Sequence, residues 1–279
     1  MNESAVYRPH AEVPAKAALQ APLFDRSSAD CAGLPADGTT RRFEIVSRGD
    51  FVPGTICVPK GGDQYPLLIV PHGAVSDPHA PLDEDVLAGW IQAGLAIALI
   101  DLPLFGKRSS PKLSERLRSG VQAAARGAEL DRDTGALVEE FSRQATSDLS
   151  RTVDALSALP EIDPSRIGFM GFGVGAVAGS YLLAHDTRIK AAALGHAGGG
   201  QGPKALDPAT YLAKARETSL FIVAAEGDSQ VAASASQTLF EAAPEPKRLE
   251  RYPSSAAGLA DIAWKELGAF FADALRLGR

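Results

Sequence analysis

Residues 163–183 read DPSRIGFMGFGVGAVAGSYLL, and this stretch decides the fold. A turn signal, Asp-Pro-Ser, precedes a short apolar run over residues 167–170 that is typical of a buried strand. Glycines follow at the alternate positions Gly171, Gly173 and Gly175, and a segment of small residues with helical spacing comes next. The pattern therefore predicts a strand, a tight glycine turn and a helix, in that order.

Predicted strands and helices alternate along the rest of the chain. Short apolar runs predict strands over residues 66–70, 94–100, 189–194, 220–225 and 248–252, and an antiparallel pair over 42–47 and 51–58. Helical spacing covers residues 82–92, 141–159, 232–243 and 259–277. This alternation predicts an α/β fold, in which a mostly parallel twisted sheet of about eight strands carries helices on both faces.

The length of the chain predicts one domain with an appended arm. At 279 residues and 45% hydrophobic content, the chain can bury a large core. Residues 1–40 lack sustained periodicity, so we expect an N-terminal arm that packs on the domain or is partly loose, and a domain over 41–279. A charged helical pattern predicts a helical insertion over residues 108–140. It is explained most simply as a solvated helix face, and a lid over a pocket is the alternative.

The composition predicts a small-molecule or protein partner. A formal net charge of −6 without a basic run argues against binding to nucleic acid or to an anionic membrane. The two cysteines, Cys31 and Cys57, form neither a disulfide framework nor a metal cluster. The first residues lack an apolar leader, and the run over 95–100 is too short to span a bilayer. We therefore expect a cytoplasmic location.

Further motifs accompany the glycine turn. They are Pro71-His72-Gly73 after one strand, Asp101-Leu102-Pro103 with Gly106 after the next, RIGFMG over residues 166–171, and EGDSQV over residues 226–231. Because these motifs occur in this order and spacing, the stretch from about residue 42 to the C-terminus resembles the α/β-hydrolase family. Within that family it is most similar to the dienelactone-hydrolase-like and acetyl-xylan-esterase-like branch. In that family the glycine turn is the nucleophile elbow, G-x-S-x-G.

The resemblance implies a site in which two reactive side chains are replaced. The nucleophile position falls on Gly173, the acid position on Asp228 and the histidine position on Ala257. The backbone N–H groups of Val174 and of Gly73 or Ala74 would form the oxyanion hole. The remaining binding positions that the resemblance implies are His72, Phe105 and His196.

Glycine and alanine cannot perform acyl transfer, which needs an attacking atom with a lone pair and a base. The resemblance therefore implies a relative of serine carboxylic-ester hydrolases that is inactive as a standard esterase. One alternative is a module that binds or senses a small ester, lactone or carboxylate. Another is a non-hydrolytic enzyme that uses His196 or Asp228 as its base.

Simpler roles exist for several of these residues. Asp228 is also suited to capping the helix after it, and His196 to a structural role. A metal site from His72, His79 and His196 has no ligand spacing behind it, and Ser76 lacks an evident partner base as a substitute nucleophile. The string G-x-G-x-x-A at 171–176 fits a dinucleotide fingerprint, but no acidic residue occurs over 191–196, where one is expected. We expect neither a cofactor nor a metal.

Overall fold

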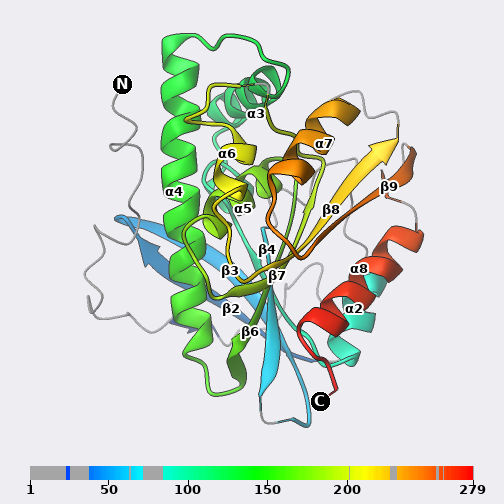
Figure 1. Ribbon diagram of the computed structural model, residues 1–279. Helices are drawn as coiled ribbons and strands as arrows, with labels where there is room; N and C mark the ends of the chain where they lie inside the picture. Colours follow the sequence, from blue (N-terminus) through cyan, green and yellow to red (C-terminus); the bar gives the residue numbers. More distant parts are fainter. Residues whose placement is uncertain are drawn as a thin grey trace.

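A computed structural model describes residues 23–25, 38–62, 64–71, 84–200, 202–226, 231–255, 258–259 and 261–278. Within them, one sheet has the strand order β1-β2-β3-β5-β4-β6-β7-β8-β9-β10 (Figure 1). The strands are β1 (Leu23–Asp25), β2 (Gly38–Ser47), β3 (Asp50–Pro59), β4 (Tyr65–Pro71), β5 (Ala96–Ile100), β6 (Ile162–Phe172), β7 (Ile189–Gly195), β8 (Ser219–Glu226), β9 (Lys247–Ser255) and β10 (Gly258–Leu259).

Helices connect the strands and cover the sheet. They are α2 (Glu84–Gln92), the 3-10 turn η2 (Gly106–Arg108), α3 (Pro111–Ala125), α4 (Arg132–Ser157), α5 (Val174–Leu183), α6 (Pro208–Leu212), α7 (Ala233–Ala242) and α8 (Asp261–Ala274). None of these helices is long and apolar enough to cross a membrane.

The sheet has the predicted mixture of strand directions. Strands β4 to β9 run parallel to one another. Strands β2 and β3 form the predicted antiparallel pair, and β3 joins the sheet antiparallel to β5. The eight strands β2 to β9 have five or more residues each, and the short β1 and β10 add to the sheet beside β2 and β9. The predicted mostly parallel sheet of about eight strands is confirmed.

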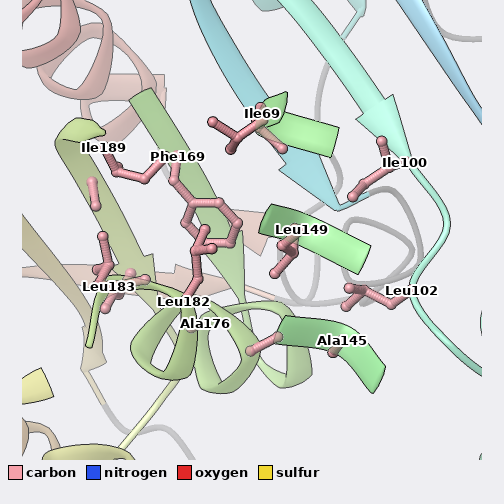
Figure 2. Close-up of a cluster of buried hydrophobic side chains, with 14 of the residues drawn as sticks. Ile69, Ile100, Leu102, Ala145, Leu149, Phe169, Ala176, Leu182, Leu183 and Ile189 are labelled. Carbon is pink, nitrogen blue, oxygen red and sulfur yellow. The ribbon is translucent and has the colours of Figure 1, made fainter. Parts of the chain in front are cut away.

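The two faces of the sheet bury different side chains because side chains alternate along a strand. On β6, Phe169 packs on the face that α4 and α5 cover, together with Ile69 and Leu149 (Figure 2). Met170 and Phe172 pack on the opposite face, against residues of α2 and α8. The continuous apolar strands thus form a sheet that is buried on both faces, as parallel sheets are.

The predicted boundary between the charged helical insertion and the next helix, at residues 140 and 141, is wrong. The sequence predicted a helical insertion up to residue 140 and a separate amphipathic helix from residue 141, but α4 runs unbroken from Arg132 to Ser157. The Asp131 carboxylate caps its first turn by accepting hydrogen bonds from the N–H groups of Asp133 and Thr134. The 108–140 segment therefore comprises η2, α3 and the first part of α4. Whether it acts as a lid stays a prediction.

Two more local expectations were wrong. Residues 208–212 form α6, which was not predicted, although Asp207 followed by Pro208 is a typical helix start. The final helix begins at Asp261, because Leu259 belongs to β10. The predicted arm and domain boundary stay predictions, because residues 1–22 and 26–37 lie outside the described residues.

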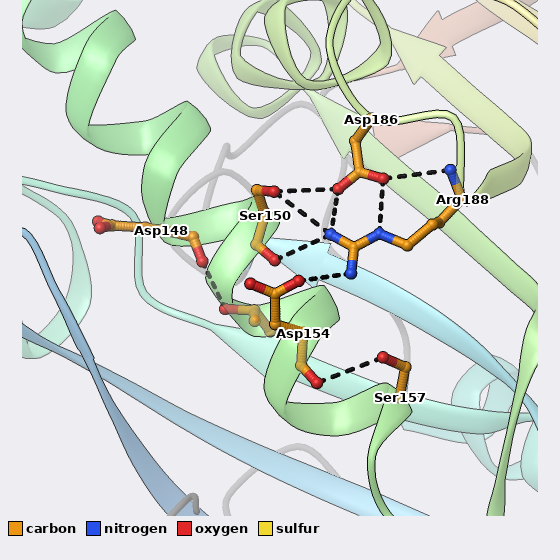
Figure 3. A network of polar contacts seen from close by, with 7 residues as sticks. Asp148, Ser150, Asp154, Ser157, Asp186 and Arg188 are labelled. Atoms are coloured by element: carbon orange, nitrogen blue, oxygen red, sulfur yellow. Dashed lines mark hydrogen bonds and ion pairs between the residues drawn. The ribbon is translucent and has the colours of Figure 1, made fainter. Parts of the chain in front are cut away.

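An arginine network joins α4 to the segment between α5 and β7. The Arg188 guanidinium donates hydrogen bonds to the carboxylates of Asp186, at 2.6 and 2.8 Å, and Asp154, at 2.5 Å (Figure 3). The Ser150 hydroxyl donates to Asp186 as well, at 3.0 Å. Although burial alone would raise the pKa of Asp186, the hydrogen bonds and charge of Arg188 lower it. Asp186 therefore stays ionised inside the protein and holds α4 in place.

A second arginine, whose side chain is buried, joins three further segments. The Arg108 side chain is 8% exposed, and it donates to Asp148 on α4 and to Asp50 beside the β2–β3 turn, at 2.7 Å each. It also donates to the Asp101 carbonyl oxygen, at 3.1 Å. Asp148 is fully buried. Burial raises the pKa of the Asp148 carboxyl, and the adjacent Arg108 guanidinium opposes that rise.

We expect Arg108→Met to destabilise the protein by about 3–5 kcal/mol at neutral pH, because it leaves the buried Asp148 charge uncompensated. A carboxyl group whose pKa is raised by folding binds its proton more tightly in the folded state, so stability falls as the pH rises through that pKa. The loss should therefore be smaller at pH 5 than at pH 8. Urea denaturation at both pH values measures it.

Arg118→Met is the matched control, because Arg118 pairs with Glu115 at the surface, where the two side chains are 52% and 66% exposed. We expect its effect to stay below about 1 kcal/mol. Equal losses in the two variants would contradict the role given to Arg108.

Candidate functional site

A single residue separates β6 from α5. Strand β6 ends at Phe172, helix α5 begins at Val174, and Gly173 between them has φ 54° and ψ −121°. Residues with a Cβ atom disfavour this backbone conformation, whereas glycine adopts it readily. Gly173 is partly exposed at the carboxyl edge of the sheet. The predicted strand, glycine turn and helix are confirmed.

The neighbouring glycines allow the helix to fold back onto its strand. A Cβ atom on Gly171 would lie 2.6 Å from the carbonyl carbon and oxygen of Gly175 and 2.9 Å from the Ala176 nitrogen. Real Cβ atoms essentially never come this close to backbone atoms. Glycine at position 171 is thus required by the close approach of β6 and α5.

Backbone hydrogen bonds fix the turn. The Gly173 N–H donates to the Gly195 carbonyl oxygen on β7, at 2.9 Å, and the Gly173 carbonyl accepts from the N–H groups of Ala176 and Val177, at 3.1 Å each. The Val174 N–H lies in the first turn of α5, where helix geometry provides no acceptor within the helix. This geometry suits a donor to a carbonyl oxygen placed at the turn.

The irregular start of β6 explains the turn signal before it. In the pairing with β4, Tyr65 lies opposite Ile162 and Leu67 lies opposite Ile167, so the residues between them on β6 bulge out of the ladder. The Asp163 carboxylate accepts hydrogen bonds from the Ser165 N–H and hydroxyl within this bulge. The Asp-Pro-Ser segment is thus a bulge at the start of the strand.

His196 lies beside the turn. It directly follows β7, whose last residue Gly195 pairs with Phe172 of β6, and its N–H donates to Val223 of β8 at 3.3 Å. Its φ of 50° is unusual for a residue other than glycine. The residue as a whole is partly exposed, the imidazole Nε2 atom is buried, and the ring centroid is 6.0 Å from that of the Phe172 ring. The structure therefore brings two predicted site residues, Gly173 and His196, together.

Phe105 lies in the loop between β5 and η2. Its ring is 8% exposed and packs edge-on against Phe141 of α4, with centroids 6.3 Å apart. Its neighbour Leu104 is partly exposed and has φ 65°. The Asp101 carboxylate accepts from the Lys107 N–H, at 2.8 Å, and so closes the loop. The binding role of Phe105 stays a prediction, as does that of Leu104, which belongs to the same predicted pocket loop over residues 104–107.

Several predicted site residues lie outside the described residues. They are His72, Gly73, Ala74, Asp228 and Ala257, together with His79 and Ser76. The described strands that lead towards them are β4, β8 and β9, which run parallel to β6 or to its parallel neighbours. The carboxyl ends of parallel strands lie at one edge of a sheet, so these strands end at the edge that carries Gly173. The roles of the five residues stay predictions.

Tyr252 anchors the end of β9, shortly before the predicted histidine position. Its hydroxyl donates to the Glu266 carboxylate on α8 at 2.5 Å. Burial and this carboxylate raise the pKa of the Tyr252 phenol, so it stays protonated. Sequence reasoning did not find this pair, because Glu266 lies on the following helix and only packing brings it to Tyr252.

The described residues contain no group of three or more histidine, cysteine or acidic side chains arranged to hold a metal ion. Two of the three histidines in the metal alternative, His72 and His79, lie outside them. The expectation of no metal and no cofactor stays a prediction.

The sequence of the second half of the chain decides its family. The family model described as "Dienelactone hydrolase family" matches residues 118–260, which are 143 of the 279 residues and include the glycine turn. The chain belongs to the dienelactone hydrolase family. The predicted resemblance to this branch of the α/β hydrolases is thereby confirmed.

Solved structures of this family's fold cover most of the chain. A cold-adapted esterase from an Arctic intertidal metagenomic library has a TM-score of 0.66 at 19% identity, with 89% of this chain and 99% of that one covered. An acetyl xylan esterase from a Paenibacillus species has a TM-score of 0.68 at 15% identity, with 92% and 89% covered. A putative dienelactone hydrolase from Klebsiella pneumoniae has a TM-score of 0.60 at 17% identity, with 84% and 98% covered. No curated protein matches the sequence.

We expect Gly171→Ala to destabilise this dienelactone hydrolase family member by at least about 1–3 kcal/mol, because its Cβ atom would overlap the backbone of α5. Gly89→Ala is the matched control. Gly89 lies exposed in α2, with nothing within 4 Å of an added Cβ, so alanine should stabilise the helix by roughly 0.5–1 kcal/mol. Thermal and urea unfolding measure both effects. Equal stability of the two variants would contradict the close approach.

Proposed function

We propose that this chain is a relative of serine carboxylic-ester hydrolases that has lost standard esterase activity. In this proposal Gly173 occupies the nucleophile position, Asp228 the acid position and Ala257 the histidine position. The observation that carries the proposal is the backbone of Gly173, which joins β6 to α5 with φ 54° and ψ −121°. Membership of the dienelactone hydrolase family supports an ester-hydrolase ancestry.

The chemical consequence follows from the two replaced side chains. Serine attack needs a hydroxyl oxygen and a base that removes its proton, and neither glycine nor alanine supplies such a group. In a serine protease that serves as a measured example, removal of either the serine or the histidine lowers turnover by about 10⁶-fold, and removal of both lowers it little more. A chain that lacks both groups therefore has no route through an acyl-enzyme.

The site proposed to remain is a binding site for a carbonyl or carboxylate group. The N–H of Val174 and that of Gly73 or Ala74 would donate to the ligand oxygen, with His72 supporting their loop. Phe105 and His196 would lie on the surrounding loops. The ligand would be a small ester, lactone or carboxylate. The net charge of −6 supports a partner other than nucleic acid, and the presence of only two cysteines supports a cytoplasmic location.

We expect the purified protein neither to react covalently with a fluorophosphonate probe nor to hydrolyse p-nitrophenyl acetate appreciably. The probe requires a nucleophilic hydroxyl, and the proposed site has none. Intact-protein mass spectrometry measures labelling, and absorbance at neutral pH measures hydrolysis. A stoichiometric phosphonyl adduct would refute the proposed loss of activity.

We expect the double substitution Gly173→Ser and Ala257→His to create probe labelling, whereas each single substitution should leave the protein close to unlabelled. The two residues act as a unit, so neither suffices alone. Serine at φ 54° should also lower the stability by about 1–3 kcal/mol, and unfolding measurements monitor this cost. The control adds Ser76→Ala to the double variant, and labelling should persist in it. Labelling that is lost with Ser76 would contradict the assignment of position 173 as the nucleophile position.

A second candidate function is ligand sensing without chemistry. The partly exposed turn at Gly173 and Val174 supports it, because the Val174 N–H in the first turn of α5 is suited to donate to a ligand oxygen placed there. In a panel of acetate, benzoate and γ-butyrolactone, at least one compound should raise the melting temperature in a concentration-dependent way. Unchanged melting across this panel would argue against the sensing function.

A further inference from the structure

Two apolar side chains lie exposed beside each other at the tip of the β2–β3 hairpin. Val46 and Phe51 are 42% and 55% exposed, and they are direct cross-strand partners. Partners in an antiparallel pair point to the same face of the sheet, so the two side chains form one apolar patch. Ile45 and Val52, which point to the other face, are buried. We call the outward-facing pair Val46 and Phe51 the hairpin patch.

The backbone of β2 beside this patch faces the side of the sheet that carries β1. The Asp101 N–H donates to the Pro53 carbonyl at 3.1 Å, so the backbone groups of Pro53 point to β5. Backbone groups of successive residues point to opposite sides of a strand, so those of Val52 point to β2 and to its partner Ile45. The N–H and carbonyl of Val46 therefore point to the β1 side.

Strand β1 begins one hydrogen-bonded position short of Val46. Its register pairs Leu23 with Glu44 and Asp25 with Arg42. Hydrogen-bonded and non-hydrogen-bonded pairs alternate along an antiparallel ladder, so the next hydrogen-bonded position on β2 is Val46. Among the described residues, none pairs with Val46 on this side.

The sequence just before β1 suits a continuation of this register. Two further steps place Pro22 opposite Ile45 and Ala21 opposite Val46. Proline has no N–H, and none is needed opposite Ile45, because the Ile45 backbone points to β3. Ala21 has the N–H that an exchange of hydrogen bonds with Val46 requires. A register shifted by one residue would instead place the proline at the hydrogen-bonded position.

We propose that residues 19–22, which lie outside the described residues, continue β1 along β2 and cover the hairpin patch. Ala21 exchanges two backbone hydrogen bonds with Val46 in this arrangement. The side chains of Leu19 and Ala21 fall on the face of the hairpin patch, because side chains alternate along a strand. The segment thereby closes a strand edge that would otherwise be open to pairing with another chain.

Chain connectivity favours this segment over a second copy of the protein as the occupant of the patch. Pro22 is bonded to Leu23 of β1, so the segment is held beside β2 at a high effective concentration. A second copy would have to displace it. The net charge of −6 also opposes association of two copies.

Disulfide trapping in the full-length chain, with Cys31→Ser as background, tests the register. Cys57 is buried and remains in place. Ala21→Cys with Val46→Cys should form an intramolecular disulfide under mild oxidation, because directly opposed residues have Cα atoms about 5.5 Å apart, a distance that suits a disulfide. Gln20→Cys with Val46→Cys is the matched control. Its disulfide should form about tenfold or more slowly, because residue 20 points to the opposite face.

Mass spectrometry without reduction measures trapping as a link between the tryptic peptides 17–26 and 43–48. Equal trapping in the two cysteine pairs, or faster trapping in the control, would overturn the proposal. A disulfide between two chains, detected as a dimer on a non-reducing gel, would overturn it as well, because the patch would then belong to a second copy.

Amide hydrogen exchange supplies a readout that needs no added cysteine. In the wild-type protein the Val46 N–H should exchange about tenfold or more slowly than an unprotected amide. Ala21→Pro should remove most of this protection, because proline lacks the N–H that the hydrogen-bonded position requires. Gln20→Pro is the control and should keep the protection, since position 20 needs no N–H. An unprotected Val46 amide in the wild type, or equal protection in the two proline variants, would contradict the proposal.

Discussion

The left-handed backbone of Gly173 is the constraint on which the carboxyl edge of the sheet depends. Strand β6 lies between β4 and β7 in the middle of the sheet, and the chain must turn within one residue to begin α5. Glycine at position 171 then allows α5 to fold back against β6 with its backbone in direct contact. Because α5 packs there, the face of the sheet that carries Phe169 is buried, and the first N–H groups of the helix remain at the edge where β4, β8 and β9 also end.

Backbone strain is distributed unevenly at this edge. A residue with a Cβ atom at position 173 would occupy an unfavourable conformation, and glycine avoids that cost. On the neighbouring strand, by contrast, His196 has φ 50°, which is a strained backbone conformation for a residue with a Cβ atom. Strained residues tend to gather at functional sites, where the surrounding structure fixes them. Here the His196 ring packs near Phe172, and Phe172 packs against Trp264. Glycine at position 195 leaves room for the Phe172 ring.

Two arginines, the buried Arg108 and the partly exposed Arg188, hold the long helix α4 against this framework. Residues two positions apart lie on nearly opposite sides of a helix, so Asp148 and Ser150 face different neighbours. Asp148 meets Arg108 and, through it, the β2–β3 turn and the loop after β5. Ser150 lies on the other side with Asp154, where Arg188 and Asp186 connect the helix to the start of β7. The helix is thereby fixed on both sides, and the loop that carries Leu104 and Phe105 is fixed with it.

The sequence by itself determined the elements whose signals are local. The apolar runs, the glycine turn and the antiparallel pair before β4 were predictable because side-chain period and turn chemistry act within a few residues. The absence of a side chain at position 173 was evident as well. Signals for the start of α4 at Asp131 and of α6 at Asp207 were present in the sequence and were missed. The tertiary structure decided which distant residues meet: His196 beside Gly173, Glu266 at Tyr252, and Arg108 among Asp50, Asp101 and Asp148. Strand order and helix packing set these encounters, and both depend on how the whole chain buries its apolar surface, which no short segment encodes.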